Sequence, residues 1–497
     1  MDSTIANPNI SLSNDINYKR FDPGYSDIEN IELLKEAIRV GLPSHYDFEI
    51  IKTIKKINEI KSISDERENF TVYLQMPEGL LVFSQSISLI LQHFARTSVV
   101  ILGDITYGGC CIEDQLMSIL ESSHSKSSNQ SLLVHYAHSC LIPFEELAMS
   151  KDINIANILY IFVEINLLSD HFIQTIKHNF KKEDKIALLS TIQYHSTIVG
   201  SQKCLNDYFL NPVKIPVCDP LAWGETLGCT SAIIDGDVEK CIFLSDGRFH
   251  LESAMIQNPS KVFYLYEPFS KKITRETYSH QLLHEIRKSS IVNSFKIVQA
   301  GGSNLINDSV VIGIFFSTLG RQGSFAIVER LEKLINKYNT NTNNKTKIVA
   351  CTIFASDLSA ECINDNILEG VDYSIQLACP RLSTDWGAYY KKPILNSYEA
   401  FVLLGNLSNN NFQFFCDMEN NLDLSNSEFS YLQTYPMNYW ASNGNIWCNY
   451  YSDESRNGSF GASKDQIDEI KYNIRQNKLK NLTKRKINLQ YERNELA

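Results

Sequence analysis

The amino-acid sequence predicts an α/β protein of three similar domains, with mostly parallel sheets flanked by helices, arranged around a central site. Short, continuous runs of apolar and β-branched residues alternate with helical stretches, and this alternation is typical of parallel strands covered on both faces. The chain has 497 residues, which is about three domains at roughly 150 residues each. Three times, a strand signal leads into a Gly- or Pro-containing loop that carries a cysteine.

Ten apolar runs are predicted to be strands because they are short, β-branched and bounded by turn signals. They cover residues 70–74, 98–102, 132–136, 158–163, 186–189, 241–244, 262–266, 310–316, 348–354 and 373–378. The spacing of apolar residues predicts helices over 30–62, 281–288 and 325–338. Residues 77–80, which begin with Pro77 and Glu78, are predicted to turn from a strand into a helix.

These elements divide the chain into five predicted segments. Residues 1–28 form a disordered tail, 29–165 the first α/β domain, 166–290 the second and 291–405 the third. Residues 406–497 follow, and they begin with an Asn-rich insertion over 406–427 that is predicted to be a loop. An aromatic patch over 435–451 is expected to pack back on the body. A charged tail with a helical pattern and a basic cluster begins at Lys464.

Composition and charge argue against several classes of partner. With 46 Lys and Arg against 57 Asp and Glu, the net charge is −11, whereas nucleic-acid binding depends on cations that neutralise phosphates. No run approaches the 18 apolar residues of a membrane span, and the first 20 residues lack the apolar core of a signal peptide. We therefore expect a cytoplasmic protein without direct nucleic-acid or membrane contact, whose 12 cysteines are reduced thiols or metal ligands.

Familiar cofactor and catalytic motifs are absent from the sequence. It contains no GxxxxGK[ST], no GxGxxG opening a helix, no HExxH and no GxSxG. CxxC and CxxxCxxC are also missing. Any metal site must therefore collect its ligands from distant segments of the chain.

Four cysteines lie in loops where ligands of α/β sheets are expected, outside the carboxyl ends of strands. These are Cys110, Cys111, Cys229 and Cys379. A single free cysteine is most often a small buried hydrophobe. However, Cys110 and Cys229 are 119 positions apart, and Cys229 and Cys379 are 150 apart, which favours one thiolate per domain at a common centre. Thiolates select zinc, Cu(I) or iron–sulfur clusters, and three protein ligands leave one metal position open.

Polar residues at other strand ends are further candidates. Asp246, Arg248 and His250 follow a strand directly, and Arg321 and Gln322 lie in a strand-to-helix turn whose backbone N–H groups could bind an anion. For both segments the alternative is a helix cap with a surface ion pair. His135 and His138 bracket another strand end, either as satisfied core histidines or as site residues.

Long sequence blocks around these residues resemble one family. Residues 103–114, GDITYGGCCIED, closely resemble the GDVTYGACCVDD signature of the diphthamide synthesis family, with Gly109 in place of alanine. Residues 135–141, HYAHSCL, resemble HYGHSCL, and residues 378–387, ACPRLSTDWG, resemble ACPRLSIDWG. Residues 227–230, 246–252 and 319–323 match further blocks. The resemblance runs from about residue 30 to about residue 440.

The resemblance implies three α/β domains around a 4Fe–4S cluster that is held by Cys110, Cys229 and Cys379. The adjacent Cys111 keeps the choice of the first ligand open. The implied activity is a radical S-adenosylmethionine-dependent 3-amino-3-carboxypropyl transfer. S-adenosylmethionine is the co-substrate, a histidine of elongation factor 2 accepts the group, and methylthioadenosine is released.

The resemblance also implies partners and substrate-binding residues. The eukaryotic synthase of this family has two subunits, and Cys229 with the 246–252 block favours subunit 1. A heterodimer with subunit 2, elongation factor 2 as substrate and a small electron-donor protein are implied. The implied substrate-binding residues are Asp246, Arg248, His250, Arg321, Gln322 and Arg381. Two alternatives remain open: a non-catalytic scaffold or electron-relay subunit of the same complex, and a structural zinc site on the same cysteines.

Overall fold

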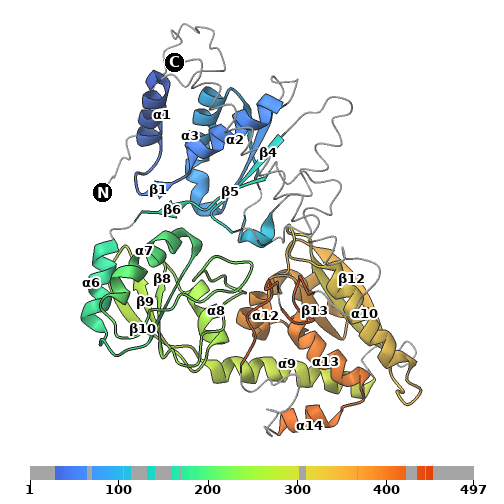
Figure 1. The fold of residues 1–497 in the computed structure, drawn as a ribbon. Helices are drawn as coiled ribbons and strands as arrows, with labels where there is room; N and C mark the ends of the chain where they lie inside the picture. Colours follow the sequence, from blue (N-terminus) through green and yellow to red (C-terminus); the bar gives the residue numbers. More distant parts are fainter. Residues whose placement is uncertain are drawn as a thin grey trace, which may run out of the picture.

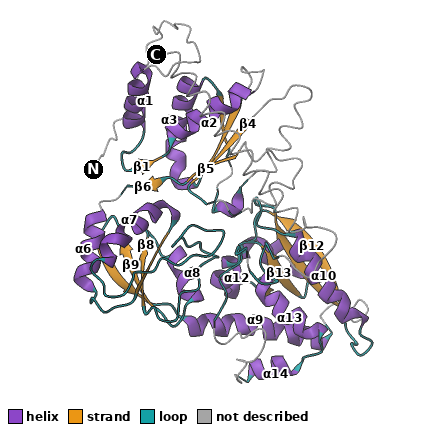
Figure 2. Cartoon of the chain, in the orientation of Figure 1, coloured by secondary structure: helices purple, strands orange, loops and turns teal. Residues whose placement is uncertain are grey.

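The computed structural model contains three four-stranded sheets and a two-stranded ribbon among its described residues (Figure 1). The described residues are 28–63, 70–103, 106–112, 131–139, 141, 158–166, 169–301, 309–366, 368–420, 434–442 and 444–451. Figure 2 shows helices beside each sheet. The predicted α/β class, with mostly parallel sheets flanked by helices, is confirmed, whereas the predicted domain boundaries stay predictions.

The first sheet is entirely parallel, in the order β3-β2-β4-β5. Its strands are β2 (Thr71–Gln75), β3 (Ser98–Ile101), β4 (Ser131–Tyr136) and β5 (Ile158–Ile161). Every residue of β4 is buried, because a central parallel strand is covered on both faces. Helix α3 (Glu78–Ala95) follows β2 and has Pro77 at its N-cap, as the turn signal predicted.

The helical structure predicted over 30–62 is confirmed for most of these residues, but it is divided. The structure has two helices, α1 (Ile28–Gly41) and α2 (Ile50–Ile63). Between them, Pro43 interrupts the helical pattern, and β1 (Tyr46–Asp47) pairs antiparallel with β6 (Glu164–Ile165).

The second sheet has the order β10-β9-β8-β7, in which only the β10–β9 pair is antiparallel. Its strands are β7 (Ile186–Ser190), β8 (Lys240–Leu244), β9 (Val262–Glu267) and β10 (Lys272–Glu276). The flanking helices are α6 (Ser169–Asn179), α7 (His195–Asn206) and α8 (Phe249–Gln257). The 3-10 turn η3 (Ile192–Tyr194) leads into α7.

The third sheet is entirely parallel, in the order β12-β11-β13-β14. Its strands are β11 (Ser309–Ser317), β12 (Lys347–Ala355), β13 (Tyr373–Leu377) and β14 (Ile394–Leu395). The accompanying helices and 3-10 turns are α9 (His280–Ala300), α10 (Phe325–Thr340), α11 (Ala360–Asn366), η4 (Leu368–Gly370), α12 (Arg381–Trp386), η5 (Gly387–Tyr389), α13 (Ser397–Ser408) and α14 (Gln413–Glu419). The predicted helices over 281–288 and 325–338 lie within α9 and α10.

All ten predicted strands are present, but the C-terminal region differs from expectation. The loop predicted over 406–427 is wrong in part, because α13 continues into it and α14 lies within it. Helix α14 forms because Phe414, Phe415 and Met418 are buried, and the Phe415 ring stacks on Phe295 with centroids 4.1 Å apart. The aromatic patch packs on the body, as predicted. The tail predicted over 1–28 lies outside the described residues except for Ile28, which begins α1. The tail predicted from Lys464 onward lies wholly outside them.

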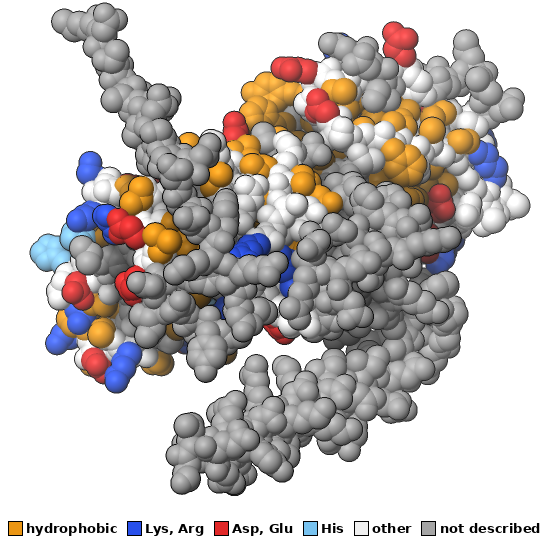
Figure 3. Space-filling view, turned by 90° about the horizontal axis from the view of Figure 1, so that it is seen from above, with side chains coloured by type: hydrophobic (Ala, Val, Ile, Leu, Met, Phe, Trp, Pro, Cys, Tyr) orange, Lys and Arg blue, Asp and Glu red, His pale blue; other side chains and the backbone are white. Residues whose placement is uncertain are grey.

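The surface carries both charged and apolar areas. Seen from above, hydrophobic side chains gather in the upper right part of the view, and charged side chains are scattered over the visible surface (Figure 3). Among the described residues, no helix is both long and apolar enough to span a membrane.

Candidate metal centre

The candidate cysteines lie beyond the carboxyl ends of strands in all three sheets. Cys110 and Cys111 belong to the 3-10 turn η1 (Gly109–Cys111), which follows β3. Cys229 lies in a tight loop that is closed by a bridge between Leu227 and Thr230. The chain just before this loop runs beside the end of β7. Cys379 comes two residues after the end of β13.

Hydrogen bonds tie the third sheet's turns to both other cysteine loops. The backbone N–H of Arg321 donates to the carbonyl of Cys110 at 2.8 Å. The guanidinium of Arg381, two residues after Cys379, donates to the carbonyl of Gly228 at 3.3 Å. The three turns are therefore one connected unit, although 119 and 150 positions separate their cysteines.

The thiols are close enough to influence one another's ionisation. The pKa of Cys110 is raised well above its usual value, by its hydrogen bond with Cys111, by burial, and by the nearby Cys229 and Cys379. Burial, followed by the charge of Cys379, raises the pKa of Cys229 to about 12. Burial also raises the pKa of Cys379 to about 11. Without a cation these thiols hold their protons at neutral pH, whereas a bound metal favours the thiolates.

Cys111 differs from its neighbour. The hydrogen bond from Cys110 is the main cause that lowers its pKa to about 7, with further contributions from backbone N–H groups and Gln322. The Gln322 amide donates to the Sγ of Cys111 at 3.3 Å and lies 3.7 Å from the Sγ of Cys110. Both sulfurs therefore lie at the centre, and Cys110 as the first ligand stays a prediction. Among the described residues, no three His, Cys, Asp or Glu side chains converge as around a single metal ion.

The turn after β11 approaches η1 so closely that only glycine fits at position 320. Gly320 has a φ of +49°, and a Cβ atom built there would lie 2.6 Å from the carbonyl carbon of Cys111 and 2.8 Å from the carbonyl oxygen of Cys110. The turn was predicted to offer backbone N–H groups to an anion, but two of these N–H groups donate within the protein. Arg321 N–H is used on Cys110, and Gln322 N–H donates to the carbonyl of Leu319.

Replacing Gly320 with alanine should destabilise the fold by about 1–3 kcal/mol, because a left-handed non-glycine residue is strained and its Cβ meets η1. Urea unfolding measures this loss. Gly236→Ala is the matched control, since a Cβ there meets nothing within 4 Å. Equal unfolding midpoints for the two variants would show that the turn is not held against η1.

Arg381 is buried in a network between the second and third sheets. Its guanidinium donates to both carboxylate oxygens of Asp385 at 2.8 Å, to Glu252 at 2.7 Å and to the carbonyl of Phe249 at 2.7 Å. It also lies 4.3 Å from the centroid of the Phe249 ring. The structure thus shows Arg381 joining the two sheets beside the cysteines, and its role towards substrate stays a prediction.

The other predicted substrate-binding residues do not all gather at the cysteines. Arg248 is exposed and forms ion pairs with Glu276 and, at 3.5 Å, with Glu252. The surface ion pair, which was the alternative to a site role for this segment, is therefore present. Asp246 is exposed beside it. Gln322 contacts the sulfurs of Cys110 and Cys111. His250 is half-buried in the first turn of α8, where burial and then the charge of Arg381 lower its pKa. The Arg321 side chain is half-buried.

Three histidines from two sheets approach one another next to this network. His135 is fully buried on β4, and its Nδ1 lies 2.8 Å from Oε1 of Gln75. The His135 and His138 rings are 5.3 Å apart. Burial, followed by the charge of His250, lowers the pKa of His138 to about 4, and burial likewise lowers that of His250 to about 4. His138 is therefore a site-proximal residue, and both rings are neutral at physiological pH.

The neutral histidines predict an acid-sensitive fold. In the unfolded chain a histidine has a pKa near 6.5, so between about pH 6.5 and pH 4 the unfolded state binds protons that the folded state excludes. Stability should therefore fall as the pH falls through this window, by up to about 1.4 kcal/mol per pH unit for each histidine. Urea unfolding of the metal-free protein at several pH values, compared with His250→Asn, measures the slope.

The His250→Asn variant should lose part of the pH dependence. The control is His178→Asn, at an exposed position of α6, which should retain the wild-type slope. An unchanged slope in His250→Asn would contradict the assignment of acid sensitivity to this ring.

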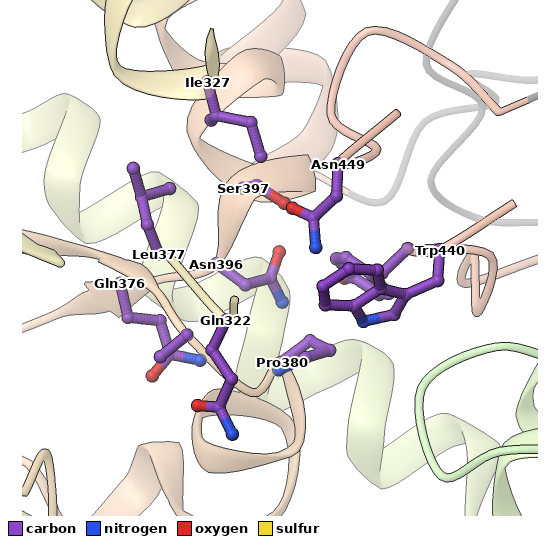
Figure 4. A pocket seen from close by; sticks show the side chains of 11 residues that line it. Gln322, Ile327, Gln376, Leu377, Pro380, Asn396, Ser397, Trp440 and Asn449 are labelled. Atoms are coloured by element: carbon purple, nitrogen blue, oxygen red, sulfur yellow. The ribbon is translucent and has the colours of Figure 1, made fainter. Parts of the chain in front are cut away.

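A recess lies beside Gln322 and Pro380, the residue that follows Cys379 (Figure 4). Its wall combines amide side chains of Gln376, Asn396 and Asn449 with the ring of Trp440. Its volume of about 10 Å³ is far below the ~300 Å³ of small-molecule pockets. A cavity of about 450 Å³ lies beside β7, but none of the four cysteines lines it.

Several residues of the centre were missed by the sequence analysis. Gln75 joins His135 to the cysteine turn, because its amide donates to the carbonyl of Cys111 at 3.0 Å. The hydroxyl of Thr230 lies 3.9 Å from the Sγ of Cys229. The sequence signal for Gln75 was its position at the end of a predicted strand. Thr230 lies next to a candidate cysteine and within the 227–230 block that matches the family.

Comparisons with known proteins agree with the motifs. The family model for diphthamide synthesis proteins matches residues 76–413. The 2-(3-amino-3-carboxypropyl)histidine synthase subunit 1 of Dictyostelium discoideum is 38% identical over 432 residues, which are 85% of this chain and 77% of that protein. The subunit 1 of Homo sapiens is 39% identical over 375 residues, 76% of this chain and 75% of that protein.

Solved structures share the fold. The crystal structure of Dph2 from Pyrococcus horikoshii with a 4Fe-4S cluster superposes with a TM-score of 0.52, at 20% identity, and the match covers 72% of this chain and 91% of that chain. A second crystal structure of the same protein gives a TM-score of 0.51 at 21% identity. The sequence blocks, the family match and the relatives agree, and the chain belongs to the diphthamide synthesis protein family.

Proposed function

We propose that this chain is the catalytic subunit of a 2-(3-amino-3-carboxypropyl)histidine synthase. It would transfer the 3-amino-3-carboxypropyl group of S-adenosylmethionine to an imidazole carbon of a histidine in elongation factor 2. The products are the modified histidine, methylthioadenosine and a proton. The observation that carries the proposal is the meeting of cysteine-bearing turns from all three sheets in one hydrogen-bonded centre.

The donor set fits a 4Fe–4S cluster. Cys110, Cys229 and Cys379 offer three soft thiols whose isolated thiolates are costly here, so a positively charged iron centre would stabilise them. Three protein ligands leave one iron open. When bound, the cluster would supply a single electron and an open iron position for the methionyl part of S-adenosylmethionine.

The chain's own residues would hold and tune this centre. Gln322 donates to the sulfur side of η1, and a hydrogen bond to a cluster thiolate raises the reduction potential. Arg381 holds the Cys229 loop against the Cys379 turn, and its positive charge offsets part of the rise that burial causes in the pKa of both thiols. Neutral His250 lies near enough to Arg381 to interact with it, and it would serve as a hydrogen-bonding group towards substrate.

The proposal includes partners. The relatives are named as subunit 1 of the synthase, which supports assembly of this chain with a subunit 2. Elongation factor 2 would be the protein substrate, and a small electron-donor protein would reduce the cluster. The competing role is that of a scaffold or electron relay, in which subunit 2 performs the chemistry.

An anaerobic transfer assay tests the proposal. The chain, co-purified with subunit 2, receives dithionite, elongation factor 2 and S-adenosylmethionine labelled in its aminocarboxypropyl group. We expect label in elongation factor 2 and methylthioadenosine in equal amounts. Equal labelling by a complex that contains Cys229→Ala in this chain would instead assign the chemistry to subunit 2. A colourless, zinc-loaded chain after anaerobic reconstitution with iron and sulfide would overturn the cluster.

A further inference from the structure

The C-terminal segment formed by the described residues 434–442 and 444–451 contacts the Cys229 loop directly. It lies beyond residues 76–413, which the family model matches, and its aromatic residues predict only that it packs on the body. Its backbone N–H at Tyr439 donates to the carbonyl of Cys229 at 3.3 Å, and its carbonyl at Met437 accepts from the N–H of Ser231 at 2.8 Å. An isolated bridge pairs Thr230 with Asn438. The segment therefore lies antiparallel to the loop and pairs with it through backbone hydrogen bonds, as an added strand would.

Thr230 connects this segment to Cys229. Its side chain is fully buried, and its Oγ1 accepts a hydrogen bond from the N–H of Trp440 at 3.0 Å. The same hydroxyl donates towards the Sγ of Cys229, which lies 3.9 Å away. The N–H of Trp440 donates to a lone pair of the Thr230 oxygen. The hydroxyl proton of Thr230 therefore stays available for donation to the sulfur.

The other side of the segment is anchored in the third sheet's region. The Tyr435 hydroxyl donates to Glu399 at 2.8 Å and accepts from the amide of Asn396 at 2.6 Å. The carbonyl of Trp447 accepts from the hydroxyl of Ser397 at 3.0 Å. Figure 4 shows Trp440 and Asn449 facing Asn396, Gln322 and Pro380 across the recess. The segment thus contacts the Cys229 loop, while it also lies against residues next to the other cysteines.

We infer that this segment is an integral part of the metal centre, because it positions the Cys229 thiol. Thr230 is then the positioning residue through which the segment fixes the sulfur. Rigid support beyond the ligands themselves commonly sets metal affinity and redox potential. The inference rests on the proposed function only in taking Cys229 to be a cluster ligand. The contact between the segment and the loop does not depend on it.

The test compares Thr230→Val, which removes the hydroxyl at similar volume, with Thr230→Ser, which retains it. In metal-free full-length protein, hydrogen–deuterium exchange of the Trp440 amide should accelerate roughly 3- to 10-fold in Thr230→Val, because one hydrogen bond is lost. Thr230→Ser should exchange like wild type. Thr340→Val, at the exposed end of α10, is the control for loss of a hydroxyl elsewhere.

The second measurement uses the iron-loaded protein. Thr230→Val should hold iron about 10- to 100-fold more weakly against a chelator, and its cluster should have a more negative midpoint potential because the sulfur loses a donor. Thr230→Ser should restore both properties. Wild-type exchange in Thr230→Val would overturn the contact, and wild-type iron retention and potential would overturn the positioning role.

A backbone variant keeps the test decisive if Thr230→Val folds poorly. Trp440→Pro removes the N–H donor, whereas Trp440→Phe keeps the N–H and an aromatic ring. The inference expects weaker iron retention in the proline variant alone. A wild-type chain that never binds a cluster would contradict the proposed function, whereas a wild-type cluster unaffected by Trp440→Pro would contradict only this inference.

Discussion

Cys229→Ala should abolish or strongly weaken the iron–sulfur chromophore of the anaerobically reconstituted chain. The thiol lies in the loop that Arg381 joins to the Cys379 turn, and no other described cysteine belongs to that loop. With two of the three proposed thiolates left, the proposed cluster would lose its connection to the second sheet. Iron and sulfide content, together with absorbance near 400 nm, measure the loss.

The control for this prediction is Cys204→Ala, at an exposed position of α7, which should keep wild-type iron content. Cys110→Ala and Cys111→Ala extend the experiment to the open choice in η1. If Cys110 is the ligand, its variant should lose the chromophore while Cys111→Ala retains it. Wild-type iron and absorbance in Cys229→Ala would remove this residue from the ligand set and favour the scaffold or relay role.

Arg287→Met should destabilise the protein by about 3–5 kcal/mol, the usual cost of leaving a buried charge without its partner. Arg287 on α9 and Glu399 on α13 are both fully buried, with Nη2 and Oε2 2.6 Å apart. The same guanidinium donates to the carbonyls of Ser383 and Ile394 at 2.8 and 2.6 Å. Since Ser383 lies on α12, just after Cys379, the variant should also retain iron less well.

Urea unfolding of single and double variants separates the pair from its surroundings. The double variant Arg287→Met with Glu399→Gln should lose less stability than the two single losses added together, because it leaves no unpaired charge. Lys296→Met is the control, since its ion pair with Glu419 is more than half exposed and should contribute less than about 1 kcal/mol. A loss below 1 kcal/mol in Arg287→Met would contradict the buried ion pair.

The local elements of this fold could be predicted from the sequence, because strand and helix formation depends on periodic burial of neighbouring residues. All ten apolar runs became strands, and Pro77 marked the start of α3. The predictions were wrong where burial came from distant partners. Helix α14 within the Asn-rich segment is held by Phe295 of α9. Over 30–62 the helical pattern is confirmed, but it did not separate α1 from α2 on either side of Pro43.

The sequence by itself determined the family and the cysteine positions, since long motifs and regular spacing are properties of the chain alone. Only the tertiary structure decided which groups meet. Gln322 reaches Cys111 across 211 positions, and Trp440 reaches Thr230 across 210. Arg381, whose role towards substrate stays a prediction, joins the second and third sheets through Glu252 and the carbonyl of Phe249. These contacts depend on how three separately patterned sheets pack, and hydrophobic periodicity within each sheet carries no information about that packing.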